Sequence, residues 1–276
     1  MKAFAFCLGA LFWLCVAPVA AADLGDTVPG HPGLTYFDLM RLVVTDLAPG
    51  GKDGAVGHQV MPFEHIDGKE AKGDPPETIA LQYIETMAIP GDESRIVILA
   101  DLGPSEGQVA DAALLALFVL SPAPRLLDVV EVGTDRFTSF SDAKVGLLAP
   151  RTPLILITST HSNSEQTYLS TKVMFVRRDR FQLIDAIFTF GERSCAYDRT
   201  QEPSFTMFAG PRPYSAVHVS VLERVTLTGE ACDDQKAPRP SVATYQANYR
   251  WDARRQRFTT RSGELDRLAA EDAKRF

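Results

Sequence analysis

Hydrophobic side chains alternate with polar or small ones along most of the chain from residue 79 onward, and short turns interrupt the alternation. A period of two places successive side chains on opposite faces of a β-strand. Short connections between such runs favour antiparallel neighbours, so the pattern predicts a meander of β-hairpins. The strands expected from it are 79–89, 96–102, 112–120, 126–132, 154–160, 168–176, 181–190, 216–228, 244–251 and 257–260.

An amphipathic helix is expected before the strands, between Thr35 and Leu47. Hydrophobic residues recur there at helical spacing, on one face that packs on the core. Thr35 and Asp38 form a capping box with Asp in place of Glu, and Pro49 ends the segment. The residues of the predicted inner face are Tyr36, Met40, Val43 and Leu47.

A second packing helix is expected at the end of the chain, opening at Ser262 to Leu265. Its expected inner face consists of Leu265, Leu268, Ala269 and Phe276. With both helices, the sequence predicts an α+β fold that is mostly antiparallel β: a meander of hairpins with an N-terminal and a C-terminal packing helix.

The first 22 residues have the pattern of a cleavable signal peptide. Lys2 is followed by an uncharged apolar stretch at 3–17, and Ala20-Ala21-Ala22 offers a small-residue cleavage site before Asp23. The apolar stretch is shorter than the roughly 20 residues of a membrane-spanning helix, which argues against an uncleaved anchor. We therefore expect a periplasmic or secreted protein with no membrane span after cleavage, whose residues 23–276 form one β-rich globular domain.

Two cysteines remain after such a cleavage, Cys195 and Cys232. An even number of cysteines in an oxidising compartment usually pairs, so a disulfide between them is expected. Closing a loop of roughly 38 residues contributes about 4 kcal/mol in the chain-entropy account. The alternative, a redox-active or nucleophilic cysteine, lacks a C-x-x-C motif and a nearby base.

Two segments share a strand–turn–strand shape, 115–132 and 172–190, and each carries an Asp inside its returning strand. They suggest duplicated hairpin halves near 34–150 and 151–276. Asp128 and Asp185 are flanked by apolar residues, and a carboxylate there is costly to bury without a partner. If the hairpins pack symmetrically, the two carboxylates could meet as an acid/base pair. The alternative is that each lies on a solvated strand face, paired with an arginine such as Arg125.

The tract 159–167 is the most polar one between two strong strands, and we expect it to be a loop. Ser159, His161, Asn163 and Gln166 are candidate binding residues, because such side chains form adaptable hydrogen bonds to sugars, peptides or a partner backbone. His161 with a nearby serine is also a candidate catalytic pair, although the G-x-S-x-G elbow of serine hydrolases is absent. A solvated loop without function is the remaining alternative.

The tract 191–208 combines charged and aromatic residues around Cys195, and we expect it to be a loop held by the disulfide. Tyr197 and Arg199 are its candidate binding residues, since these types are common at interaction surfaces. The alternative is a long loop that the disulfide merely stabilises and that has no binding role.

No cofactor and no metal site is expected. The five histidines form no metal-binding pattern, and no glycine-rich phosphate cradle follows a strand. The formal net charge of −7 argues against nucleic acid and anionic membranes as partners.

Four segments together give the chain a family resemblance. LTYFDLMRLVVTDL, THSNSEQTY, FTFGERSCAYDRT and YRWDARRQRF resemble exported, uncharacterised proteins of Gram-negative bacteria, over most of the chain after the leader. The resemblance implies export and brings no activity and no functional residues.

From these patterns we expect a soluble binding or interaction module of the cell envelope, whose partner is an envelope protein or polymer. The alternative is a hydrolase that uses Asp128 and Asp185, or His161 with a serine, and whether the chain is an enzyme is left open. A purely structural accessory of the envelope is the third interpretation.

Overall fold

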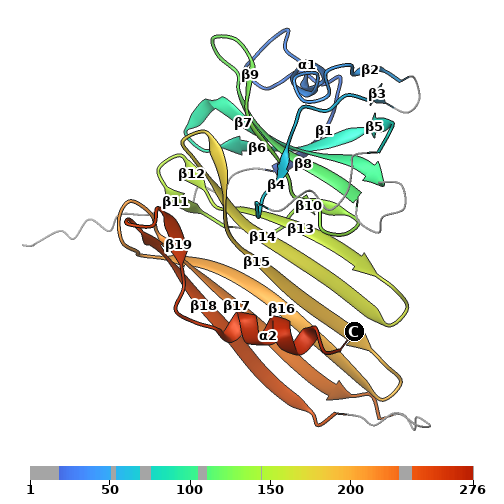
Figure 1. Cartoon of the computed structure of the whole chain (residues 1–276), viewed down its shortest axis with the longest axis vertical. Helices are drawn as coiled ribbons and strands as arrows, with labels where there is room; N and C mark the ends of the chain where they lie inside the picture. The colour runs from blue at the N-terminus through green and yellow to red at the C-terminus, as the bar shows by residue number, and fades with distance from the viewer. Residues whose placement is uncertain are drawn as a thin grey trace, which may run out of the picture.

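Two large sheets stacked on one another make up most of the molecule (Figure 1). The structure is a computed structural model that describes residues 19–50, 54–68, 76–104, 111–143, 145–229 and 238–275. Most of the predicted leader therefore lies outside the described residues. All strand pairs but one are antiparallel, and a helix lies near each end of the described chain, so the predicted fold class is confirmed.

The first sheet has six strands in the order β1-β6-β7-β8-β9-β4. β4 runs parallel to β9, and every other pair is antiparallel. β1 is an edge strand that contains the predicted cleavage site at Ala20–Ala22. The six strands are β1 (Val19–Asp23), β4 (Glu64–His65), β6 (Tyr83–Ile89), β7 (Asp92–Pro104), β8 (Asp111–Val119) and β9 (Arg125–Glu131).

The central strands of this sheet are buried on both faces, as their nearly continuous hydrophobic sequence predicts. On β7, Ile96 and Ile98 face the N-terminal segment, whereas Val97 and Leu99 face the second sheet. β8 divides its side chains in the same way. The first sheet is therefore the middle layer of the upper part of the molecule.

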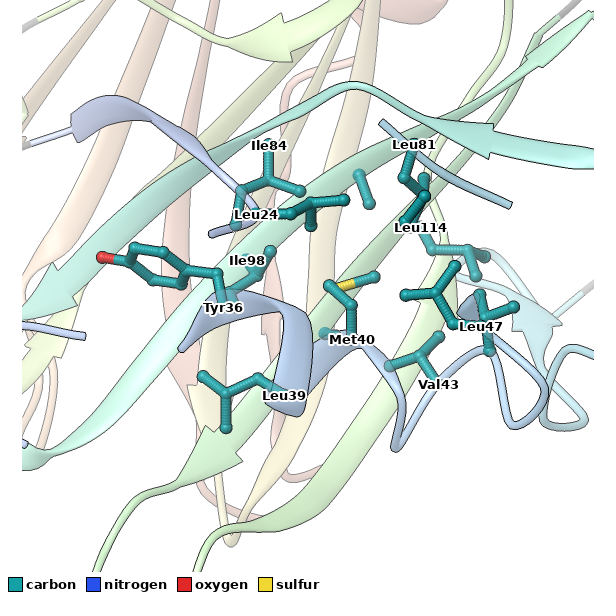
Figure 2. Close-up of a cluster of buried hydrophobic side chains, with 14 of the residues drawn as sticks. Leu24, Tyr36, Leu39, Met40, Val43, Leu47, Leu81, Ile84, Ile98 and Leu114 are labelled. Atoms are coloured by element: carbon teal, nitrogen blue, oxygen red, sulfur yellow. The ribbon is translucent and has the colours of Figure 1, made fainter. Parts of the chain in front are cut away.

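The N-terminal segment covers the outer face of the first sheet. Figure 2 shows α1 (Tyr36–Met40) and the chain after it packed against side chains of the sheet such as Ile98 and Leu114. All four predicted inner-face residues, Tyr36, Met40, Val43 and Leu47, are buried in this cluster. The capping box is present: Asp38 N donates to Thr35 Oγ1 over 3.2 Å, and Thr35 N donates to Asp38 Oδ2 over 2.9 Å.

The predicted helix between Thr35 and Leu47 is wrong in its length, because α1 ends at Met40. The next residues form backbone hydrogen bonds with a distant segment: Met61 N donates to the Val43 carbonyl, and Thr45 N donates to the Gln59 carbonyl. The β-branched run Val43-Val44-Thr45 favours such pairing over continued helix.

The second sheet has eight strands in the order β10-β13-β14-β15-β16-β17-β18-β19, all antiparallel. They are β10 (Thr138–Phe140), β13 (Ile155–Ser162), β14 (Gln166–Arg177), β15 (Arg180–Arg193), β16 (Tyr197–Phe208), β17 (Ala216–Leu227), β18 (Ser241–Asp252) and β19 (Arg257–Thr259). The hairpins that carry the two segments 115–132 and 172–190 lie in different sheets.

The remaining strands of the described residues form two small sheets. One is β2-β3-β5 and joins the N-terminal layer, and the other is β11-β12. Their bounds are β2 (Ala48–Pro49), β3 (Ala55–Gly57), β5 (Ile79–Leu81), β11 (Leu147–Ala149) and β12 (Thr152–Pro153).

The C-terminal helix α2 (Glu264–Asp272) lies across the lower strands of the second sheet (Figure 1). Leu268 is buried, as predicted, whereas Ala269 is exposed, so its predicted inner position is wrong. Asp272, one turn after Leu268, is fully buried there, and the reason is the polar cluster described below. Phe276 lies outside the described residues.

The two large sheets meet in a hydrophobic layer, and charged side chains cross it in both directions. Asp128 Oδ2 of β9 accepts from Phe181 N of β15 over 2.7 Å, and Glu85 Oε2 of β6 accepts from Phe140 N of β10 over 2.7 Å. In the opposite direction, Lys172 Nζ of β14 donates to the Val132 carbonyl over 2.6 Å. Each bond satisfies a backbone group of the facing sheet, which would be costly to bury without a partner.

We predict that Asp128→Ala destabilises the chain by about 2–3 kcal/mol, because it leaves the buried Phe181 N–H without its acceptor. Asp128→Asn keeps an acceptor oxygen and is expected to cost roughly 1 kcal/mol. Urea unfolding at neutral pH measures both values. Equal stability of the two variants would contradict a role of Asp128 as acceptor for Phe181.

Candidate functional site

The tract predicted as a loop at 159–167 is mostly strand. β13 continues to Ser162 and β14 begins at Gln166, so the turn is only three residues long. Asn163 Oδ1 organises this turn, accepting from Glu165 N over 2.9 Å and from Gln166 N over 2.7 Å. An Asn side chain that bonds to the backbone ahead of it favours a tight turn, and this local effect was not part of the prediction.

The tract 191–208 was also predicted as a loop, and the structure shows a strand instead, β16. β16 pairs with β17 over its whole length, but with β15 at only two positions, Glu192↔Arg199 and Arg193↔Asp198. Pro203 lies in the part of β16 that does not pair with β15. A proline cannot donate a ladder hydrogen bond, so this position suits it. The second sheet is thus split between β15 and β16.

Gln201 bridges the split. Its Oε1 accepts from Phe190 N of β15 over 2.8 Å, and its Nε2 donates to Glu223 Oε2 of β17 over 2.8 Å and to Asp272 Oδ1 of α2 over 2.9 Å. Arg275 donates to both of these carboxylates. The cluster therefore joins two strands of the sheet to the end of the C-terminal helix.

The two carboxyl groups of this cluster differ in their electrostatics. Burial alone would raise the pKa of Glu223, but the Gln201 hydrogen bond and the Arg275 and Arg199 guanidiniums outweigh it and hold the pKa below its ordinary value. For Asp272 burial is the stronger effect and raises the pKa, although Gln201 and Arg275 oppose it. The guanidiniums of Arg275 and Arg199, with the Gln201 hydrogen bond, therefore outweigh the effect of burial at Glu223 but not at Asp272.

Arg199 lies at the edge of this cluster. Its Nη1 is 3.3 Å from Glu223 Oε2, and its Nε is 3.7 Å from Glu192 Oε2. Its guanidinium also lies over the Tyr197 ring, 6.0 Å from the centroid. Burial raises the pKa of Tyr197, and a hydrogen bond with Glu192 adds to the effect. Two of the predicted binding residues, Tyr197 and Arg199, are therefore in contact with each other.

A cleft of about 540 Å³ opens beside the split between β15 and β16. We call it the polar cleft. It holds three predicted binding residues, Asn163 and Gln166 from the first tract and Arg199 from the second. Phe190 and several hydroxyl and carboxylate side chains complete it. Its lining is residues 163–167, Leu169, 189–193 and 198–202.

Ser159 and His161, predicted in the same loop, lie on β13 and do not line the polar cleft. Ser159 is buried, and its Oγ is 2.8 Å from Thr138 Oγ1. His161 Nδ1 lies 3.3 Å from the carboxylate of Asp135, and its ring stacks on Tyr168 at 5.3 Å. Within the described residues no serine hydroxyl bonds to His161, so the structure does not bring the candidate Ser–His pair together.

Asp128 and Asp185 do not meet either. Asp128 faces the interface between the sheets, where Arg180 Nη1 lies 2.6 Å from its Oδ1, so its arginine partner is Arg180 rather than Arg125. Asp185 accepts hydrogen bonds from the Tyr249 hydroxyl of β18 and from Ala186 N. Burial raises the pKa of Asp185, and Asp266 of α2 adds to the effect. The two carboxylates thus belong to separate structural contacts.

Cys195 lies in the short connection between β15 and β16. Cys232 falls outside the described residues, so the disulfide between them stays a prediction. Among the residues that the structure describes, no group of three or more His, Cys, Asp or Glu side chains is arranged to hold a metal ion. Neither helix of the described chain has the length and apolarity required to cross a bilayer.

No protein-family model, no curated protein and no solved structure matches this chain.

We predict that Asp185→Asn increases the free energy of unfolding near pH 7.5 and has little effect at pH 3 to 4. The folded chain holds the pKa of Asp185 above its ordinary value of 3.8, so it binds the proton more tightly than the unfolded chain. The stability contributed by this group is therefore lost as the pH rises through the raised pKa, and Asn removes that loss while accepting from Tyr249.

Urea unfolding of the wild type and the variant across this pH range measures the effect. Glu202→Gln, which changes an exposed carboxylate on β16, is the matched control and should show no such trend. A difference between Asp185→Asn and the wild type that stays constant with pH would contradict the prediction.

Proposed function

We propose that this chain is an exported binding protein of the cell envelope and that the polar cleft is its recognition site. The observation that carries the proposal is the convergence of Asn163, Gln166 and Arg199, from two tracts about 30 residues apart in sequence, on one cleft. Strands of the second sheet position Gln166 and Arg199, and backbone hydrogen bonds in the β13–β14 turn hold Asn163. This ordering reduces the entropy lost when a ligand binds.

The chemistry of the cleft favours a polar ligand. Amide and hydroxyl groups of Asn163, Gln166, Thr167 and Thr200 offer donors and acceptors along its walls. Its charged residues are mostly acidic, with two arginines, Arg193 and Arg199. Such a lining suits the hydroxyl or amide groups of an envelope glycan or an extended peptide better than an apolar molecule.

A hydrolase is less well supported. Asp128, Asp185 and Ser159 each satisfy a structural contact, and His161 is bonded to Asp135 rather than to a nucleophile. A catalytic site needs these groups within reach of one another and of a substrate. We therefore favour binding without chemistry.

Export to the periplasm or beyond, and the Cys195–Cys232 disulfide, are part of the proposal. The Thr228 hydroxyl donates to the Cys195 carbonyl, and Thr228 N donates to the Ala196 carbonyl over 3.1 Å. Cys232 follows Thr228 by four positions, so the chain after β17 starts next to Cys195. This proximity supports a disulfide that closes the end of the β16–β17 hairpin near the polar cleft.

The test blocks the cleft with a large side chain. Thr200 is exposed and lines the cleft, so Thr200→Trp should weaken binding about tenfold or more by occupying the ligand's space. Ser204→Trp is the matched control, since Ser204 is exposed on the same strand and outside the cleft. Protein recovered from the periplasm is applied to arrays of envelope glycans and of extended peptides.

We expect the wild type and Ser204→Trp to retain the same ligands and Thr200→Trp to lose them, with unchanged circular dichroism for all three. Retention of the ligands by Thr200→Trp, or no retained ligand for the wild type on either array, would contradict the proposed function.

A further inference from the structure

The hairpin formed by β18 and β19 is strongly basic, in contrast to the chain as a whole. The chain carries a formal charge of −7, yet residues 250–261 contain a single acid, Asp252. The arginines of this segment are Arg250, Arg254, Arg255, Arg257 and Arg261. A local field of the opposite sign to the net charge attracts an anion to this part of the surface.

A cavity of about 660 Å³ lies against this hairpin. We call it the arginine cavity. Arg250, Arg254 and Arg261 line it, together with the Asn248 amide and the hydroxyl residues Thr259, Thr260 and Ser262. Pockets of this size accommodate an organic molecule rather than only a small ion.

The arginines of the cavity outnumber the acids that line it. Arg250 lies over the Phe208 ring, 5.6 Å from its centroid, which orients the guanidinium without pairing it. In the part of the chain that the structure describes, neither Arg254 nor Arg261 forms an ion pair. Two positive charges or more are therefore left for a ligand.

Asp252, the single acid of the lining, is committed to the turn of the hairpin. Its Oδ1 accepts from Arg254 N over 2.9 Å and from Arg255 N over 3.1 Å. These backbone bonds, the one from Arg255 first, hold the pKa of Asp252 below its ordinary value. Three arginines and one aspartate leave a surplus of two positive charges in the lining.

We propose that the arginine cavity binds a phosphate-bearing ligand through Arg250, Arg254 and Arg261. A phosphate monoester carries a charge of about −1.5 to −2 at neutral pH, which matches the surplus. Arginine binds phosphate oxygens in a bidentate manner, and the nearby hydroxyl and amide groups suit the polar body of a phosphorylated compound.

This site is independent of the proposed function. Arg199, in the polar cleft, lies at the first end of β16, whereas Phe208, against Arg250, is at the other end. Nine residues of extended strand separate them by about 30 Å. Figure 1 shows the turn between β18 and β19 and the end of α2 at opposite ends of the second sheet. A negative binding result at one site therefore does not bear on the proposal for the other site.

Trp251 provides an intrinsic probe, because it lines the arginine cavity. The chain contains two tryptophans, Trp13 and Trp251, so Trp13→Phe leaves Trp251 as the single tryptophan whether or not the leader is cleaved. The Arg177 guanidinium lies over its ring, 5.0 Å from the centroid. A ligand that binds to these arginines should change the fluorescence emission of Trp251.

The experiment titrates the Trp13→Phe protein at low salt with glucose 6-phosphate and with glucose, and separately with vesicles of phosphatidylglycerol or of phosphatidylcholine. We expect a saturable change with the phosphate-bearing compound or with the anionic vesicles and none with glucose. Response to glucose 6-phosphate identifies a soluble ligand, and response to phosphatidylglycerol alone identifies a lipid headgroup. Binding in either arm should weaken as salt is raised.

Arg254→Gln and Arg261→Gln should each weaken that binding about tenfold, as expected for the loss of a hydrogen bond to a charged group. Arg224→Gln removes an exposed arginine of β17 outside the cavity and is the matched control, with binding unchanged. Equal responses to glucose and glucose 6-phosphate, no response in either arm, or unchanged binding in Arg254→Gln and Arg261→Gln would overturn the proposal.

Discussion

The structure depends on buried polar side chains that complete backbone hydrogen bonds where strands do not. Asp128, Glu85 and Lys172 do this between the two sheets, and Gln201 does it across the split between β15 and β16. A buried backbone group without a partner costs as much as a lost hydrogen bond. Three of these contacts therefore allow the two sheets to pack together, and the fourth allows β15 and β16 to separate within the second sheet. Because the split at Gln201 is also where the polar cleft opens, the same constraint positions the candidate site.

The sequence predicts the strands well where alternation is regular and the connections are short, as in the hairpins around 91 and 178. It misplaces elements where a distant segment decides the outcome. α1 ends early because Val43 and Thr45 pair with residues that lie 14 or more positions ahead. The sequence predicts a loop at β16 because charges and Pro203 interrupt its alternation. The proline is tolerated because β15 does not pair with this part of β16, and that pairing is a property of the whole sheet.

The candidate site was predicted in part. The chemistry of Asn163, Gln166 and Arg199 predicts that they bind a ligand, and the structure brings them to one cleft. Glu223 and Asp272, which accept hydrogen bonds from Gln201, are not among the predicted residues. Glu223 nevertheless interrupts a strand of alternating valines, and a buried carboxylate there implies a partner. Asp128 and Asp185 were expected to meet through the similarity of two hairpins. A short repeat does not fix which sheet each hairpin joins, and the two lie in different sheets.

Side chains serve as backbone hydrogen-bond partners at the borders of β15, and hydrogen exchange of two amides tests this role most directly. Phe181 N donates to Asp128 Oδ2 and Phe190 N donates to Gln201 Oε1. In NMR-detected exchange of the unmodified protein, both amides should exchange as slowly as those of the β14–β15 ladder, through opening close to global unfolding. Exchange as fast as that of the amides in the β13–β14 turn would contradict the claim.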